Sequence, residues 1–345
     1  MSIVTDHHHQ PQPAPRAGVI TRRAAMAGPL GLLVVLLGAV AANPALRQML
    51  GEAVRSIDPR AVLVVLPVQF LAILLCTAAQ QALRVGIPFG SSLIARLVRD
   101  AAHNLLIFPP GLGEAVGARV VVLLGGRGRA AVALRALDIA AEVIAELPYM
   151  ALAFWVLWHW WHGGNAVAMP DVHVAWRPEW TAALLLPVAA YVGWRVWRAS
   201  SHHQHWIQTR TGRRVRAETH LMRRELARQK AGLPLAIALH VVAWGLSGVQ
   251  VWLAAQVFGL HLSLFGALAI ESAATSARVI LFFVPGGLVM QEAGAVLAGA
   301  ALGVAAPQAL ALSLVLRLRD VVFGVALGLW PWLEYRARRN RQRQN

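Results

Sequence analysis

Two apolar segments that proline and glycine interrupt decide how this chain is expected to fold. The first interruption, residues 104–114, has the sequence NLLIFPPGLGE, and the second, residues 284–294, has the sequence VPGGLVMQEAG. Proline removes a backbone hydrogen-bond donor and clashes with the preceding helical turn, and the neighbouring glycines do not favour helical angles. We therefore expect each surrounding segment, residues 91–124 and 264–303, to form two short helices. The predicted break residues are Pro109, Pro110, Gly111, Gly113, Pro285, Gly286 and Gly287.

The composition of the 345 residues indicates a membrane protein. Hydrophobic residues make up 57% of the chain and charged residues 14%, and the mean hydropathy is +0.55. An ordinary soluble domain has about 45–50% apolar and about 25% charged residues. The formal net charge is +16, but the cations lie in short runs between apolar stretches, which is typical of membrane topology rather than of a nucleic-acid groove. The composition therefore excludes a soluble globular protein and a nucleic-acid partner.

Uncharged runs predict about six full membrane spans beside the two broken hairpins. Residues 24–46 and 61–83 each hold 23 residues without a charge, enough to cross about 30 Å of hydrocarbon at about 1.5 Å per residue. Further spans are expected at residues 137–161, 179–197, 233–258 and 308–331. The predicted fold class is all-α, a polytopic transmembrane helical bundle in which the two re-entrant hairpins form an inverted pseudo-repeat.

The distribution of positive charge predicts the orientation. Ten arginine and lysine residues lie in residues 195–230, and five arginines lie close to the carboxyl terminus. Because an excess of arginine and lysine marks cytoplasmic segments, both termini are expected in the cytoplasm, although Arg47, Arg55 and Arg60 oppose this orientation. The predicted parts are a disordered tail (1–26), a transmembrane domain (27–331) with a basic cytoplasmic loop (199–230), and a basic tail (332–345). The first apolar run also has features of a cleaved signal peptide, but an anchor is favoured because further spans follow.

A glutamate follows each predicted break, Glu114 in the first half and Glu292 in the second. In the predicted topology the first hairpin begins from the cytoplasm and the second from the outside, so the halves are related by inversion. Interrupted segments at corresponding positions of two halves indicate a transporter binding site. A carboxylate gains about 0.3–1 kcal/mol at a helix amino terminus, less than the roughly 2.5–3.5 kcal/mol that an ionised side chain costs near the membrane centre. A functional role is therefore favoured for these glutamates.

Other charged residues interrupt the apolar segments at helical spacing. Arg135, Asp138 and Glu142 share one face of a helix, and they fit either a salt-bridge ladder near the membrane interface or a polar pathway. Glu146 continues this face, and for it we favour the ladder. Glu271 and Arg278 lie two turns apart on another helix, and Arg317, Arg319 and Asp320 interrupt the last span. The residues predicted to line a substrate pathway are Glu114, Arg119, Asp138, Glu142, Glu271, Arg278, Glu292, Arg317 and Asp320.

No metal site, catalytic residue or cofactor is predicted. The single cysteine, Cys76, lies within an apolar run and is expected to pack as a small hydrophobic residue. The histidines at positions 202, 203 and 205 have no clustered cysteine or carboxylate partner. Motifs for a nucleophile elbow, a phosphate-binding loop or a zinc-binding helix are also absent.

The sequences of the two breaks resemble the signatures of the flippase-like membrane region of lysylphosphatidylglycerol synthases. They are residues 104–114, followed by Arg119, and residues 284–294, and the likeness covers about residues 30–331. The closer resemblance is to the stand-alone subfamily associated with hopanoid biosynthesis. It implies a multi-pass protein of the bacterial inner membrane that moves a lipid between leaflets. Val289 departs from the pattern, which has glycine there. Only 14 residues follow Pro331, so aminoacylation by the synthases' soluble domain is not expected of this chain.

These observations favour a translocator of a hopanoid or an anionic lipid. No enzymatic activity is expected. Membrane lipids are the expected partners, together with enzymes of lipid or hopanoid biosynthesis. One alternative is a membrane-embedded enzyme that modifies a lipid and uses Asp138 or Glu142 as a base. Another is a scaffold that recruits soluble enzymes through the basic residues 198–230. The sequence makes no prediction about the oligomeric state.

Overall fold

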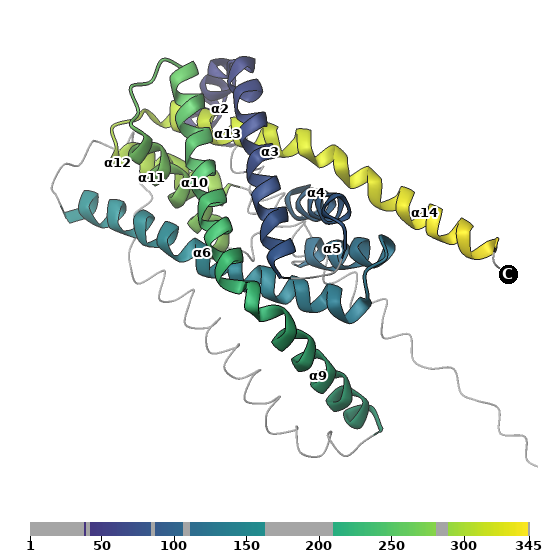
Figure 1. Cartoon of the computed structure of the whole chain (residues 1–345). Coiled ribbons are helices and arrows are strands. Elements are labelled where there is room, and N and C mark those ends of the chain that lie inside the picture. The colour runs from purple at the N-terminus through teal and green to yellow at the C-terminus, as the bar shows by residue number, and fades with distance from the viewer. Residues whose placement is uncertain are drawn as a thin grey trace, which may run out of the picture. The chain divides into compact units, whose positions relative to one another are not determined.

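The computed structural model describes residues 38, 42–83, 87–105, 111–162, 210–280 and 289–343 (Figure 1). Within these ranges the secondary structure is helical and contains no β-strand, which confirms the all-α fold class. The chain divides into two compact units after Arg47, and the contacts below all lie within the second unit, residues 48–345. The predicted tail 1–26, the span 179–197, most of the span 24–46, and Pro109, Pro110, Pro285, Gly286 and Gly287 lie outside the described residues.

The described residues form α-helices and short 3₁₀ turns along the chain. Their order is α2 (Pro44–Ser56), α3 (Pro59–Ala82), α4 (Phe89–Leu105), α5 (Leu112–Leu123), α6 (Gly128–His162), α9 (Arg210–Gln229), the 3₁₀ turn η1 (Lys230–Gly232), α10 (Leu233–Val257), α11 (Leu264–Ile280), α12 (Met290–Ala301), α13 (Ala306–Gly324), the 3₁₀ turn η3 (Val325–Gly328) and α14 (Leu329–Gln342).

Three helices are long and apolar enough to cross a membrane, judged by length and composition: Pro59–Ala82, Gly128–His162 and Thr219–Val257. They contain three of the predicted spans. The start of the first is set locally, because Asp58 accepts a 2.8 Å hydrogen bond from the Arg60 backbone N–H and Pro59 stands where no helical donor is needed.

The structure differs from the prediction at the last span. The expected span 308–331 is not one regular helix, because the 3₁₀ turn η3 separates α13 from α14. Within the predicted basic cytoplasmic loop 199–230, residues 210–229 form the helix α9, and the cytoplasmic location of this loop stays a prediction.

Both interrupted segments form the two short helices that were predicted. Helices α4 and α5 pack against each other, and so do α11 and α12. Each second helix begins after a residue with positive φ, Gly111 (φ 80°) before α5 and Val289 (φ 72°) before α12. Glycine adopts this conformation without strain, whereas a β-branched residue does not. The valine that departs from the family pattern therefore stands at a strained position.

The second helix of each hairpin approaches the first through a glycine. A Cβ at Gly113 would lie 2.9 Å from the Cβ of His103 on α4, and a Cβ at Gly294 would lie 2.5 Å from the carbonyl oxygen of Ala273 on α11. Small residues let membrane helices approach closely where lipid provides no hydrophobic driving force. The buried core around the hairpins is accordingly rich in alanine and valine.

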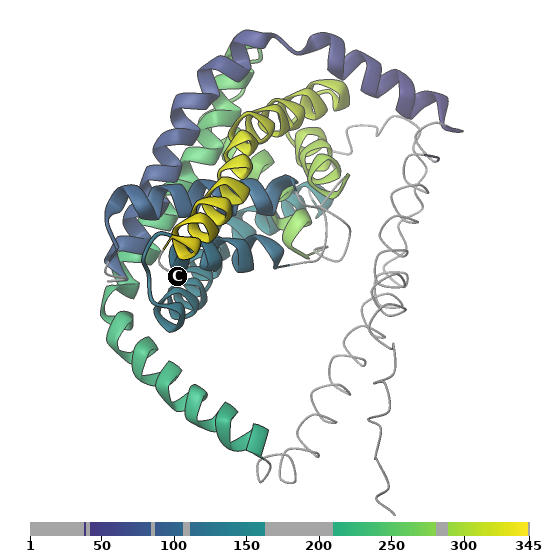
Figure 2. The same ribbon diagram turned by 90° about the vertical axis from the view of Figure 1, so that its right-hand side faces the viewer.

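The packing of the second unit repeats itself about the pair α3 and α10, which lie side by side in both views (Figures 1 and 2). These two helices are antiparallel, since His240 lies opposite Cys76 whereas Gln250, further along α10, lies opposite the earlier Gln69. Helix α6 packs on α10 and α11, and its counterpart α13 packs on α3 and α4. Antiparallel first helices followed by equivalent hairpins are what an inverted repeat requires.

Replacing Gly294 with alanine should lower the stability of the protein. The new Cβ meets backbone atoms of Ala273, which cannot move aside as a flexible side chain would, and we expect a loss of about 1–3 kcal/mol. The measurement is the Tm of the purified protein in detergent.

Gly245→Ala is the matched control, because a Cβ there meets nothing within 4 Å in the middle of α10. Alanine favours a helix over glycine by about 1 kcal/mol, so this variant should melt at the wild-type temperature or above. Equal Tm values for the two variants would contradict the close approach of α11 and α12.

Candidate functional site

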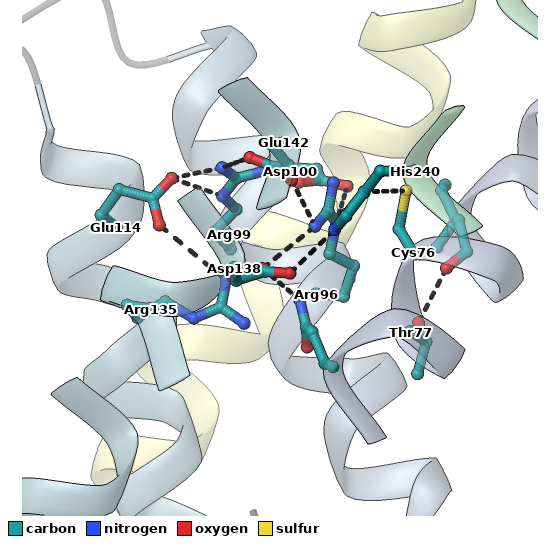
Figure 3. A network of polar contacts seen from close by, with 12 residues as sticks. Cys76, Thr77, Arg96, Arg99, Asp100, Glu114, Arg135, Asp138, Glu142 and His240 are labelled. Carbon is teal, nitrogen blue, oxygen red and sulfur yellow. Dashed lines mark hydrogen bonds and ion pairs between the residues drawn. The ribbon is translucent and has the colours of Figure 1, made fainter. Parts of the chain in front are cut away.

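Charged and polar side chains form two buried networks, one in each half of the repeat. The first network lies among α3, α4, α5, α6 and α10 and comprises Cys76, Gln80, Arg96, Arg99, Asp100, Glu114, Arg135, Asp138, Glu142 and His240 (Figure 3). The second network lies among α3, α10, α12 and α13 and comprises Gln69, Gln250, Glu292, Arg317, Arg319 and Asp320.

Arg99 joins three helices of the first half, α4, α5 and α6. Its Nε donates a 2.6 Å hydrogen bond to Oε1 of Glu114 on α5, and its two terminal nitrogens donate to the carboxylate of Glu142 on α6 at 3.2 and 2.7 Å. Nη1 also donates to the neighbouring Asp100 at 2.9 Å. A planar guanidinium that engages a carboxylate with two parallel bonds fixes both groups in orientation. Arg99 therefore holds the start of α5 and the middle of α6 against α4.

Asp138 is the centre of the first network and is fully buried. Its Oδ2 accepts hydrogen bonds from Gln80 at 2.9 Å and from Arg96 at 3.3 Å, and its Oδ1 lies 3.0 Å from Nε2 of His240 on α10. Arg96 also pairs with Glu142 at 2.7 Å. Buried ions are tolerated only when partners of opposite charge and hydrogen bonds satisfy them. Asp138 thus connects the first half of the repeat to α10 of the second.

Arg135 is the exception in this network. Its side chain is 5% exposed and lies 3.3 Å from Asp138 and 3.9 Å from Oε2 of Glu114, but none of its three nitrogens makes a hydrogen bond. Oε2 of Glu114 also has no hydrogen-bond partner. Figure 3 shows the two side chains facing each other. A buried cation with unmade hydrogen bonds beside a carboxylate with an unused acceptor is suited to bind a polar ligand.

The second network repeats this design with fewer members. Arg317 on α13 donates a 2.8 Å hydrogen bond to Oε1 of Glu292 at the start of α12, whose Oε2 lacks a hydrogen-bond partner. Arg319 donates to Asp320 at 3.0 and 2.7 Å and to Gln250 on α10 at 2.5 Å. In both halves, therefore, the glutamate after the break pairs with an arginine and keeps one oxygen unused.

Three charged side chains lie between the two networks. Glu271 on α11 is 5% exposed and accepts one hydrogen bond, at 3.3 Å from the Thr275 hydroxyl. Glu146 on α6 is buried, and its Oε1 has no partner. Arg278 on α11 interacts electrostatically with both carboxyl groups. The ladder predicted for Glu146 is wrong within the described residues, because its buried carboxylate forms no ion pair there.

Arg119 lies apart from both networks. Its side chain is 42% exposed, and it donates hydrogen bonds of 2.7 and 2.9 Å to Glu334 on α14. These bonds hold the pKa of Glu334 below its ordinary value. The structure therefore brings together the other predicted pathway residues of each half and places Arg119 at a contact between α5 and α14.

Sequence reasoning did not select Arg96, Arg99 or Asp100 on α4, nor His240 on α10. A signal for the first three was present, because charged residues three and four positions apart share a helix face inside an otherwise apolar segment. No comparable signal marks His240, since it is the only titratable residue on α10.

A metal ion would need ligands that are already engaged. Asp138, Glu142 and His240 each offer an atom within 4.8 Å of the others. Both carboxylates, however, form ion pairs with Arg96, and Glu142 also pairs with Arg99. Positive charge at this distance opposes a divalent cation, so the arrangement suits an ion-pair network better than a metal centre.

Comparison with known proteins gives one match. The family model described as "Lysylphosphatidylglycerol synthase TM region" matches residues 23–328, which contain both hairpins and both networks. No curated protein and no solved structure matches the chain. The narrower resemblance to proteins of hopanoid biosynthesis stays a prediction.

Asp138→Asn should destabilise the protein strongly. The substitution removes the nearest counter-ion of the buried Arg135 and one of the carboxylates that pair with Arg96, and breaking a buried pair in this way costs about 3–5 kcal/mol. The matched control is Asp58→Asn, which removes the charge of an exposed pair with Arg60 and retains a good helix cap. Thermal unfolding of both variants in detergent measures the difference, and similar Tm values would contradict the central role of Asp138.

Proposed function

The chain belongs to the family of the lysylphosphatidylglycerol synthase transmembrane region, and we propose that it moves a lipid between the two leaflets of its membrane. Membership and the three candidate spans make it a membrane protein of a lipid-related family. The transport of lipid, the identity of that lipid and an inner-membrane location belong to the proposal.

The observation that supports the proposal best is the unsatisfied pair formed by Arg135 and Glu114. Guanidinium matches the oxygens of phosphate or carboxylate, and here three of its nitrogens are buried without hydrogen bonds. An unmade hydrogen bond in a buried place costs free energy that a ligand can recover. A phospholipid headgroup supplies the required acceptors while its acyl chains stay in the hydrocarbon.

The equivalent glutamates of the two halves support a pathway for the lipid headgroup rather than a single binding site. Glu114 and Glu292 stand at equivalent positions after the two breaks, each with one oxygen unused. Backbone that leaves the helical path at membrane depth is tolerated where it lines a protein interior or a cavity. In our proposal a headgroup passes from one broken hairpin to the other, and rocking of the inverted halves exposes each hairpin to its own leaflet.

A specific arrangement also favours a second candidate, a membrane-embedded acyl transferase. The Sγ of Cys76 lies 3.5 Å from Nδ1 of His240, and Nε2 of the same ring lies 3.0 Å from Asp138. Cys76, His240 and Asp138 are thus arranged as the nucleophile, the base and the orienting carboxylate of covalent catalysis. The thiol would attack an ester carbonyl of a lipid, His240 would pass the thiol proton to the departing alcohol, and a thioester would remain on Cys76. Transport is preferred because Asp138 is engaged by Arg96 as well, and Cys76 is buried.

Glu114→Gln and Glu292→Gln should each slow lipid exchange by about tenfold or more. Each substitution removes a charge-assisted hydrogen bond to Arg99 or Arg317, of about 1.5–3 kcal/mol, and disturbs the headgroup contact. The measurement is dithionite quenching of fluorescent phosphatidylglycerol in proteoliposomes. Glu52→Gln, which neutralises an exposed carboxylate on α2, should exchange lipid at the wild-type rate. Unchanged exchange in both interior variants would remove the glutamates from the route.

The transferase candidate predicts a covalent intermediate. Wild-type protein incubated with a radiolabelled acyl lipid should then retain a label that hydroxylamine releases, and Cys76→Ser and His240→Ala should not. Absence of such a label, in protein that exchanges lipid, would dismiss the second candidate.

A further inference from the structure

We propose that Glu271 carries a proton across the membrane interior and thereby couples lipid movement to a proton gradient. This inference rests on the proposed function, because the coupling needs a lipid that moves. It concerns the group of side chains between the two networks, which the lipid route does not otherwise explain.

Among the described side chains Glu271, like Glu146, lacks the ion pair that the buried carboxylates of the two networks have. Asp138, Glu142 and Asp320 each form an ion pair with an arginine. Within the described residues Glu271 forms no ion pair, and its one hydrogen bond comes from the Thr275 hydroxyl at 3.3 Å. An ionised carboxyl group in an apolar interior is unfavourable unless it is paired and well hydrogen-bonded. Burial without an ion pair therefore favours the protonated form of the Glu271 carboxyl group in this conformation.

Two arginines lie near enough to Glu271 to act on its charge. Arg278 and Arg319 interact with it electrostatically without forming an ion pair, and Arg319 is engaged by Asp320 and Gln250. The titratable and charged groups around it are Arg278 on its own helix, Glu146 and Tyr149 on α6, Arg317, Arg319 and Asp320 on α13, and Glu292 on α12, while α10 presents the neutral Gln250.

The antiparallel packing of α6 on α11 extends this arrangement toward the first network. Tyr149 interacts with Glu271, and Glu146, about one turn earlier on α6, interacts with Arg278, about two turns later on α11. Glu146 in turn interacts with Glu142 of the first network. Glu142, Glu146, Arg278, Glu271 and Asp320 thus form a row of charged or titratable groups that joins the two networks through the interior.

The two helices that carry this row belong to different halves of the repeat. Helix α6 ends the first half and α11 begins the hairpin of the second, so rocking of the halves changes the distances across their contact. Arg278 interacts with Glu146 across this contact and with Glu271 on its own helix. When the movement draws Glu146 away from Arg278, the cation stabilises the carboxylate of Glu271 alone, and Glu271 releases its proton toward one aqueous side. When the halves return and Glu146 again competes for Arg278, Glu271 takes a proton from the other side. One proton is bound and one is released in each cycle, and no covalent bond of the lipid changes.

The test measures lipid distribution and proton movement together in proteoliposomes of the full chain. The probe is fluorescent phosphatidylglycerol, the membrane potential is clamped with valinomycin and potassium, and a pH-sensitive dye reports the interior. If one proton accompanies one lipid, a gradient of about one pH unit should make the lipid distribution between leaflets asymmetric by about tenfold. Lipid addition should also move protons across the membrane.

Glu271→Gln retains the shape of the side chain but cannot exchange a proton, so its lipid distribution should ignore the gradient and its proton signal should fall to the level of empty vesicles. Glu271→Asp keeps a titratable group and should restore both responses at least in part. Glu52→Gln serves as the control for a carboxylate outside the interior and should respond like the wild type. Size-exclusion elution and Tm show that each variant is folded.

The outcomes separate the inference from the proposed function. Wild-type exchange that proceeds without response to the gradient would overturn proton coupling and leave lipid movement standing. A gradient response that survives in Glu271→Gln would overturn the assignment to Glu271. No lipid movement by folded wild-type protein under any condition would overturn the proposed function, and proton coupling of lipid with it.

Discussion

The structure depends on the pairing of charges that the hydrocarbon would otherwise exclude. Arg96 and Arg99 on α4 connect the carboxylates of Asp138, Glu142 and Glu114, so that one set of ion pairs ties the broken hairpin to α6. Each of these ions is costly when buried alone and tolerable when paired. The ion pairs that permit these charges to be buried also position α4 and α5 against α6. The contact of His240 with Asp138 adds α10 to this set of helices.

Each half of the inverted repeat contains its own set of paired buried charges. Both halves put a glutamate after a break, pair one oxygen of it with an arginine and leave the other oxygen without a partner. They differ in completeness, because the first network contains an arginine, Arg135, whose hydrogen bonds are all unmade. In our proposal the headgroup visits these two unequally satisfied places in turn.

The two halves also differ in the residue that precedes the second helix of each hairpin. Gly111 enters α5 with a positive φ at no cost, whereas Val289 enters α12 in a conformation that a β-branched side chain disfavours. Strain of this kind persists where surrounding structure over-determines the backbone and is common at functional sites. Close contact at Gly294 with the backbone of α11 supplies such a constraint. The second hairpin is thus packed tightly while its turn is strained.

The sequence by itself determined the helical class, three of the spans, both broken hairpins and the family, because apolar length and proline or glycine at a break act locally on the backbone. It also determined that Arg135, Asp138 and Glu142 share a face, since that follows from helical spacing. Only the tertiary structure decided which charges meet. It joined His240 to Asp138 over a separation of 102 residues, paired Arg119 with Glu334 on α14, and left Glu271 without an ion pair among the described residues. Such pairings depend on how separate helices pack in space, and no local sequence pattern specifies which residues of different helices come into contact.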